Sequence, residues 1–122
     1  MATLDSAYVK NQLHGGRGVT VSWAGLSVND DGIWQQLVLF KYKCLHIFGT
    51  FNGAIAYLEG TNEDAQAGVP TSPIHLTDSL HQEIAVTTPG ILHVFENPLY
   101  MRPIVVGGDG DTDLTFLLVC RP

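Results

Sequence analysis

Three aspartates at alternate positions near the end of the chain are the strongest candidates for chemistry, because calcium-binding loops use this spacing. They lie in the stretch GGDGDTDLTFLL as Asp109, Asp111 and Asp113. An EF-hand loop also needs glycine at its sixth position, glutamate at its twelfth and a helix on either side. Counted from Asp109, those positions hold Leu114 and Cys120. The flanking sequences RPIVV and LTFLLV have the composition of strands.

The same stretch is better explained as a turn. Glycine and aspartate tolerate the positive φ angles of tight reversals. We therefore predict the reversal of a β-hairpin, with an adventitious or interface cation as the alternative. The histidines add no metal site, because none of the spacings HxH, HxxxH or HExxH occurs among His14, His46, His75, His81 and His93. The sequence predicts no metal ligand.

No combination of nucleophile and base is evident. The serines lack a GxSxG context, and no glycine-rich loop leads into a helix that could hold a phosphate. Neighbouring carboxylates at residues 30–31 and 63–64 fall in predicted turns, where we expect them to be solvated. Cys44 and Cys120 have no CxxC or zinc-like spacing, and we expect buried free thiols, with a disulfide as the alternative. We predict no catalytic residue, no cofactor and no enzyme activity.

Aromatic side chains on a β-sheet could instead form a stacking platform for sugars. The candidates are Trp23, Trp34, Tyr42, Tyr57 and Tyr100. Trp23 shares the parity of Val19 and Val21, which predicts a place in the core. Trp34 follows a turn and is the aromatic residue that we expect to be exposed. An exposed tryptophan beside a turn suits a protein interface or a sugar, and we favour the interface.

Short strands are the elements that would position these residues. From residue 19 the hydrophobic period is two, and turn signals such as NDDG and NG recur between apolar runs. The predicted strands cover residues 19–23, 33–40, 44–49, 54–59, 74–76, 83–87, 90–96, 100–106 and 114–120. Eight or nine short strands predict an all-β fold, either an antiparallel β-sandwich or a jelly-roll-like barrel. Pro103 predicts an edge or a bulge, since proline cannot donate to the ladder.

The length of 122 residues predicts a single β-sandwich domain, residues 19–122, after an extended N-terminal arm, residues 1–18. A marginal helix over residues 4–13 is the alternative for the arm. Twelve acidic and six basic residues give a net charge of −6, which disfavours nucleic acid as a partner. No apolar run has the length of a signal peptide or a membrane helix. We therefore expect no membrane partner and synthesis in a reducing cytoplasm.

Three stretches together resemble a group of small β-rich virion proteins of tailed bacteriophages. They are VTVSWAGLSVNDDG (residues 19–32), GTFNGAIAYLEGTNED (residues 49–64) and ENPLYMRPIVVGGDGDTDLTFLLVCR (residues 96–121). In that group a strand ending in W-x-x-L runs into a turn, a GTFGGA-x-x-x-LEGSND-like hairpin follows, and a P-x-Y-x-RP…GGDG-x-TDL segment closes the chain. This chain departs from the pattern in its long arm and in AQAGVPTSPIHLTD, which replaces a short link.

The resemblance implies a head decoration or capsid cement protein, which binds the outside of an assembled shell and clamps neighbouring capsomers. It implies a homotrimer whose partner is the phage major capsid protein, located on the capsid exterior of the virion after synthesis in the host cytoplasm. We expect the arm (residues 2–18) and the loop at residues 60–73 to contact the capsid, and Arg102 to form a structural ion pair. A neck, baseplate or tail component and a carbohydrate-binding module are the alternatives.

Overall fold

A computed structural model describes residues 18–122 and the backbone of residues 2–3 and 9–14. These residues form twelve strands and no helix, which confirms the predicted all-β class. The seven longer strands are β2 (Val9–His14), β3 (Gly18–Leu26), β6 (Tyr42–Thr50), β7 (Ile55–Thr61), β10 (Gly90–Val94), β11 (Tyr100–Val106) and β12 (Asp113–Arg121). The two-residue strands are β1 (Ala2–Thr3), β4 (Asp30–Asp31), β5 (Gln35–Gln36), β8 (Ile74–His75) and β9 (Ala85–Val86).

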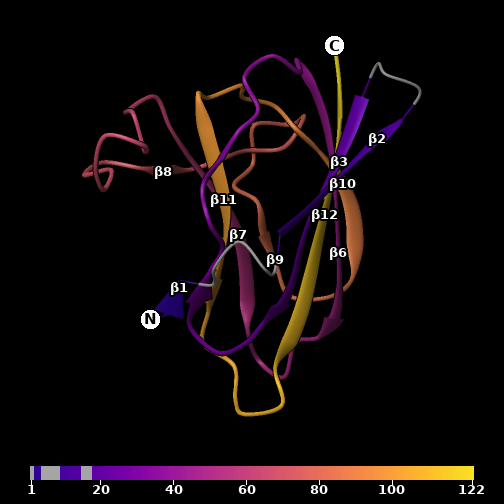
Figure 1. The fold of residues 1–122 in the computed structure, drawn as a ribbon. Coiled ribbons are helices and arrows are strands. Elements are labelled where there is room, and N and C mark those ends of the chain that lie inside the picture. The colour runs from indigo at the N-terminus through magenta and orange to yellow at the C-terminus, as the bar shows by residue number, and fades with distance from the viewer. Residues whose placement is uncertain (1, 4–8, 15–17) are drawn as a thin grey trace.

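The strands form two sheets that face each other (Figure 1). The five-stranded sheet has the order β10-β6-β12-β3-β2, and every pair in it is antiparallel. The seven-stranded sheet has the order β1-β4-β11-β7-β8, with β5 also paired to β11 and β9 also paired to β7. Its β1–β4 pair is parallel, and its other pairs are antiparallel. The predicted antiparallel sandwich is therefore confirmed.

From β3 onward most connections cross from one sheet to the other. The chain passes from β3 to β4, from β5 to β6 and from β6 to β7, and each step changes sheet. The steps from β9 to β10, from β10 to β11 and from β11 to β12 do the same. This alternation wraps the chain around the core, as in jelly-roll sandwiches, so sequential strands seldom pair with each other.

The core fills the space between the sheets with the inward-facing half of each strand. Val19, Val21 and Trp23 are 6%, 0% and 1% exposed, which confirms the face predicted from their period-two spacing. On the central strand β12, the inward positions from Leu114 to Cys120 are fully buried. The seven-stranded sheet contributes aliphatic and thioether side chains, among them Ala56, Leu58, Met101 and Val105.

Pro103 lies in an internal strand, so the expectation of an edge or a bulge is wrong. Strand β11 pairs with β7 on one side and with the short strands β4 and β5 on the other. The carbonyl of Pro103 accepts a hydrogen bond from Gly32 N at 2.9 Å on the side of β4 and β5. The ring nitrogen of Pro103 therefore faces the gap between β5 and β4. The N–H group that proline lacks costs no hydrogen bond of the sheet at this position.

Two segments differ from the predicted elements. Val9–His14 pairs with β3 from Val9↔Trp23 to His14↔Gly18, so this part of the arm is an edge strand and the helix alternative is wrong there. Ala2–Thr3 forms an edge strand of the other sheet. Residues 1, 4–8 and 15–17 lie outside the described residues. The strand predicted over residues 33–40 is reduced to Gln35–Gln36, because residues 37–40 turn, with Phe40 N donating to Leu37 O at 3.1 Å.

Candidate functional site

The acidic stretch at residues 107–112 forms a turn that its own hydrogen bonds hold together. Asp109 Oδ1 accepts from Asp111 N at 2.9 Å and from Asn52 Nδ2 at 3.2 Å. Thr112 Oγ1 accepts from Asp109 N at 2.9 Å. The predicted turn is confirmed, but the predicted hairpin is wrong, because β11 and β12 belong to different sheets. In the described part of the chain, no group of three histidine, cysteine or acidic side chains is placed to hold a metal ion.

The Asn-Gly turn between β6 and β7 lies against the acidic turn. Asn52 and Gly53 have φ angles of 47° and 88°, and Ala54 N donates to Phe51 O at 3.0 Å, which is the pattern of a type I′ turn. Thr112 Oγ1 donates to the same Phe51 carbonyl at 3.0 Å. Both turns carry the chain across the sandwich at one end, where the β11–β12 turn forms the lowest point in Figure 1.

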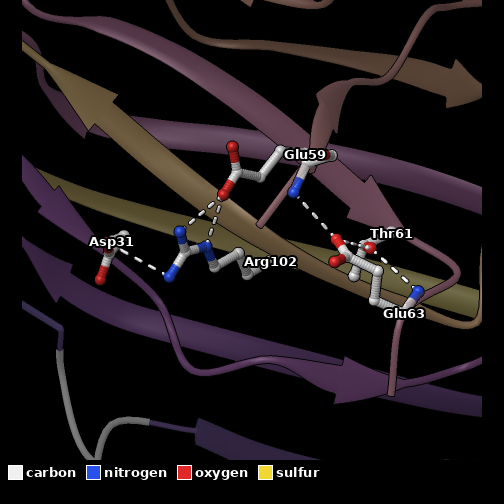
Figure 2. A network of polar contacts seen from close by, with 6 residues as sticks. Asp31, Glu59, Thr61, Glu63 and Arg102 are labelled. Atoms are coloured by element: carbon white, nitrogen blue, oxygen red, sulfur yellow. Dashed lines mark hydrogen bonds and ion pairs between the residues drawn. The ribbon is translucent and has the colours of Figure 1, made fainter. Parts of the chain in front are cut away.

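Arg102 on β11 holds two buried carboxylates from neighbouring strands (Figure 2). Its Nε and Nη2 atoms each lie 2.7 Å from Glu59 Oε1 on β7, and its Nη1 lies 3.3 Å from Asp31 Oδ2 on β4. Glu59 and Asp31 are 5% and 4% exposed. The expected structural ion pair of Arg102 is confirmed. One guanidinium therefore links β11 to both of its neighbours, and the charged groups of this cluster are used in contacts within the protein.

The carboxylate pair at residues 30–31 is buried, so the expectation that both groups are solvated is wrong. Asp31 faces Arg102, as described above. Asp30 is 7% exposed, and its Oδ2 accepts from Ser27 N at 2.8 Å and Ser27 Oγ at 3.0 Å. Both carboxylates therefore gain protein partners in place of water.

Trp34 lies half-buried on the same face as this ion-pair network. The Arg102 guanidinium carbon is 4.5 Å from the centroid of the Trp34 ring, a cation–π contact that occupies one ring face. Tyr57 stacks on His75 with ring centroids 4.3 Å apart, and Tyr100 is 4% exposed with its hydroxyl donating to Asp64 Oδ1 at 3.2 Å. Trp34 is therefore half-buried and not exposed as expected, whereas Tyr42 is 66% exposed. The described ring contacts do not join these aromatic candidates to one another.

The loop at residues 62–71 is closed by one carboxylate, that of Glu63. Glu63 Oε1 accepts from Thr71 N at 2.9 Å and Thr71 Oγ1 at 2.8 Å, and Oε2 accepts from Ser72 N at 2.9 Å and Thr61 Oγ1 at 3.0 Å. Figure 2 shows Glu63 beside Thr61 at the end of β7. These bonds, first those from the Thr71 and Ser72 backbone, lower the pKa of Glu63 to about 2. Glu63 is therefore an anchor for the loop.

The anchored loop presents an apolar tip and borders a cleft. Val69 at the tip is 90% exposed, and the loop projects beside β8 at the left of Figure 1. The cleft has a volume of about 610 Å³ and is lined by Gly60, Thr61, Asn62, Glu63, Ser72, Ile74, Leu76, Glu96, Asn97 and Pro98. Its two carboxylates, Glu63 and Glu96, are hydrogen-bonded within the protein, Glu96 to Thr77 N at 2.8 Å and Thr77 Oγ1 at 2.6 Å. The cleft could therefore hold a ligand through its shape and its amide groups. Its two carboxylates are already used in hydrogen bonds within the protein, so it is not suited to acid–base chemistry.

A buried lysine that we did not predict from the sequence lies at the end of the core opposite the acidic turn, where Lys43 is the register partner of Cys120. Lys43 is 2% exposed, and its Nζ donates to the carbonyl of Phe40 and to Oδ1 of Asn97. Desolvation lowers the pKa of Lys43. The sequence signal for this burial is period-two spacing. Lys43, Leu45 and Ile47 alternate in YKCLHI, which places all three on the inward face of β6. The lysine closes the core and has no access to a substrate.

Both cysteines are free thiols, so the alternative of a disulfide is wrong. Cys120 is fully buried on the inner face of β12, and burial raises its pKa to about 11, with nearby Lys43 acting in the opposite direction. Cys44 is half-buried and has the opposite parity on β6, between the inward-facing Lys43 and Leu45. The two thiols therefore point to opposite faces of the same sheet.

The comparisons with known proteins return no relative. No protein-family model, no curated protein and no solved structure matches the chain. None of the described residues lies in a helix that is long and apolar enough to span a membrane.

Proposed function

We propose that this chain is a non-enzymatic structural protein of a phage virion, a head decoration or cement protein that binds the outer surface of the capsid. The proposal starts from the sequence resemblance over residues 19–121. The observation that carries it further is the loop at residues 62–71, which is tied at its base by Glu63 and exposes Val69 at its tip. A loop that is ordered before contact loses little conformational entropy when it binds a partner.

The sandwich supports this role because its fold is rigid and its buried polar groups have hydrogen-bond partners within the protein. Within the described residues, no buried side-chain nitrogen or oxygen lacks a hydrogen-bond partner. The titratable groups of the cleft and of the ion-pair network are used in structure, as described above. Such a fold suits a clamp that must keep its shape while neighbouring capsomers are held together. The resemblance implies a homotrimer, and any oligomer that offers the same contact more than once gains from effective concentration.

In this proposal the loop at residues 60–73 contacts the major capsid protein. The arm at residues 2–18 is the second proposed contact, although Ala2–Thr3 and Val9–His14 within it also form edge strands of the two sheets. Deleting the whole arm would remove that strand as well as any capsid contact. Single substitutions at the loop tip therefore test the proposal more cleanly than a deletion.

The test is co-sedimentation of the purified chain with phage heads assembled without it. We expect saturable binding in many copies per head, and we expect Val69→Asp to weaken it. Leu80→Asp is the matched control, because Leu80 is also an exposed apolar loop residue, 75% exposed, outside the Glu63 loop. Binding of a few copies at one vertex would favour a neck or tail component. Absence of binding by the folded protein would overturn the proposal.

A further inference from the structure

Asn52 is followed by glycine, and no other asparagine of the chain is. The residues that follow the other four asparagines are Gln12, Asp30, Glu63 and Pro98. Asparagine is thermolabile, because the next backbone nitrogen can attack the carbonyl carbon of its side chain and expel ammonia. A side chain on the next residue hinders this attack, and glycine has no side chain. The sequence therefore makes Asn52 the asparagine most prone to deamidation.

The fold leaves the reacting groups of this Asn-Gly turn accessible. Asn52 and Gly53 are both exposed, and a Cβ atom placed on Gly53 would meet no heavy atom within 4 Å. The turn is closed by the hydrogen bond from Ala54 N to Phe51 O, and within the described residues the Gly53 N–H makes no hydrogen bond. The attacking nitrogen is therefore not held by another group, and water reaches the turn.

The other asparagines with described side chains hold backbone groups of other segments. Asn29, Asn62 and Asn97 have as partners, in that order, Gly107 N at 2.8 Å, Leu99 N at 2.9 Å and Val38 O at 2.9 Å. The Asn52 amide instead donates to an exposed side chain, with Nδ2 3.2 Å from Asp109 Oδ1. This contact joins the Asn-Gly turn to the acidic turn. The other three asparagines are internal controls for a modification at Asn52.

We propose that Asn52 is a site of spontaneous deamidation, and that the carboxylate formed there removes the contact between the two turns. The Gly53 nitrogen bonds to Asn52 Cγ, the Cγ–Nδ2 bond breaks, and ammonia leaves with the proton of the Gly53 N–H. Water then opens the cyclic imide. Cleavage of the bond between the imide nitrogen and Cγ gives aspartate, and cleavage of its bond to the main-chain carbonyl carbon gives isoaspartate. Water is the co-reactant, and no electrons are transferred.

The aspartate product reverses the contact with Asp109. The amide of Asn52 donates to Asp109 Oδ1, whereas a carboxylate in its place repels Asp109, because two neighbouring carboxylates disfavour each other's ionised form. Asp109 Oδ1 also accepts from Asp111 N at 2.9 Å, so the acidic turn keeps its own hydrogen bond. The product therefore separates the two turns without removing the bonds inside either one. It also adds a negative charge to a chain whose net charge is −6.

The isoaspartate product disrupts the Asn-Gly turn itself. It adds a methylene group to the main chain, whereas a type I′ turn is built from two central residues of ordinary length. The carbonyl of Phe51 accepts from Ala54 N across this turn and from Thr112 Oγ1 of the acidic turn, each at 3.0 Å. Both products therefore loosen the same end of the sandwich, where the chain crosses from one sheet to the other.

This modification goes beyond the proposed function, and its test needs no capsid. The purified full chain is incubated at mildly alkaline pH and then analysed by peptide mapping with mass spectrometry. We expect the peptide that contains Asn52 to gain the mass difference between OH and NH2, while the peptides of Asn29, Asn62 and Asn97 keep their masses. Asn52→Gln is the matched control, because glutamine keeps an amide but cyclises far more slowly. Conversion at Asn52 no faster than at the other three asparagines would overturn the proposed site.

Freshly purified variants test the effect on the two turns. Asn52→Asp reproduces the aspartate product and should lower the midpoint of thermal unfolding by about 2 °C at low salt. The shift should be smaller at high salt, because exposed charges are screened. Adding Asp109→Asn should recover the midpoint, since an amide again faces a carboxylate.

The double variant is measured before ageing, because Asp109→Asn creates an Asn-Gly dipeptide at residues 109–110. Circular dichroism of each variant establishes that the fold is retained. An unchanged midpoint in Asn52→Asp, or one that the second substitution does not recover, would contradict the proposed loss of contact between the turns.

Discussion

The two outer faces of the sandwich differ in whether their side chains find partners within the protein. On the outer face of the seven-stranded sheet, which we call the covered face, Arg102 holds Asp31 and Glu59 beneath Trp34, and Ile104 is 7% exposed. On the outer face of the five-stranded sheet, which we call the open face, Ile91 is 65% exposed. The covered face contains its own partners, whereas the open face leaves Ile91 exposed to solvent.

The difference between the two faces indicates which residues contribute to the free energy of folding and which could contribute to the free energy of binding. Buried charges contribute to the unique arrangement of β4, β7 and β11 only while all of them are present. Exposed apolar side chains contribute little to folding and become stabilising when a partner removes them from water. Substitutions on the covered face should therefore change the free energy of unfolding. Substitutions at exposed positions of the open face should leave the free energy of unfolding nearly unchanged.

The largest effect on folding is expected from Arg102→Met. Removing the guanidinium takes the cation away from the buried carboxylates of Asp31 and Glu59, which should lower the free energy of unfolding by about 3 kcal/mol. Urea denaturation measures the change. Adding Glu59→Gln to this variant should recover part of the loss, because one of the two carboxylates is then replaced by a neutral amide. A loss below about 1 kcal/mol, as for an exposed ion pair, would show that the covered face is not buried in solution.

A matched isoleucine pair compares the two faces directly. Ile104→Thr on β11 should lower the free energy of unfolding by about 2 kcal/mol, because it removes buried apolar surface and buries a hydroxyl. Ile91→Thr on β10 should change it by less than about 0.5 kcal/mol in the monomer. Thermal and urea unfolding of both variants, at a concentration where the chain is monomeric, provide the comparison. Equal losses for the two variants would contradict the distinction between the faces.

The local structure of both faces could largely be predicted from the sequence. Period-two spacing predicted the burial of Trp23 and the strand β12, and Asn52-Gly53 predicted a tight turn that the φ angles confirm. The dipeptide fixes a local reversal, but it does not specify which sheet the next strand joins. That choice depends on contacts between residues far apart in sequence. The predicted tight turn at residues 52–53 and the predicted hairpin at residues 107–112 are therefore connections between the two sheets.

The polar network could not be predicted for the same reason. Asp31 lies within the turn signal NDDG and Glu59 ends an apolar run, so each resembles a solvated acid when considered alone. They are buried because Arg102 lies between them on β11 in the assembled sheet. Glu63 and Thr71 likewise meet across a loop that has no periodicity. The chemistry of individual residues was visible in the sequence, whereas their juxtaposition is a property of the strand order.

A smaller effect is expected from Trp34→Ala, which removes the aromatic ring from the covered face. Loss of the cation–π contact and of the cover over Arg102 should lower the free energy of unfolding by about 1 kcal/mol. In the Arg102→Met background the same change should cost less, since the cation is absent. A double-mutant cycle measured by urea unfolding isolates this coupling. A coupling of zero would show that Trp34 covers the face without interacting with the guanidinium.

The smallest effect on global stability is expected from Glu63→Gln, because its carboxylate holds a surface loop. Its pKa of about 2 lies below the ordinary value of 4.5, so its contribution is complete above pH 4.5 and is lost as the pH falls toward 2. Amide NMR shifts of Thr71 and Ser72 should therefore titrate at low pH in the unmodified protein. In Glu63→Gln those amides should be shifted at neutral pH and show no such titration.

Glu83→Gln is the matched control for the loop, because Glu83 is an exposed glutamate whose contact is His75, with Oε2 2.7 Å from Nδ1. It should leave the Thr71 and Ser72 amide shifts and their pH dependence unchanged. Tyr100 connects the loop to the covered face through Asp64, and burial raises the pKa of Tyr100. If Glu63→Gln also disturbs Tyr100, the loop is part of the cover of that face. If Tyr100 is unaffected, the loop is an independent element that moves without exposing the ion-pair network.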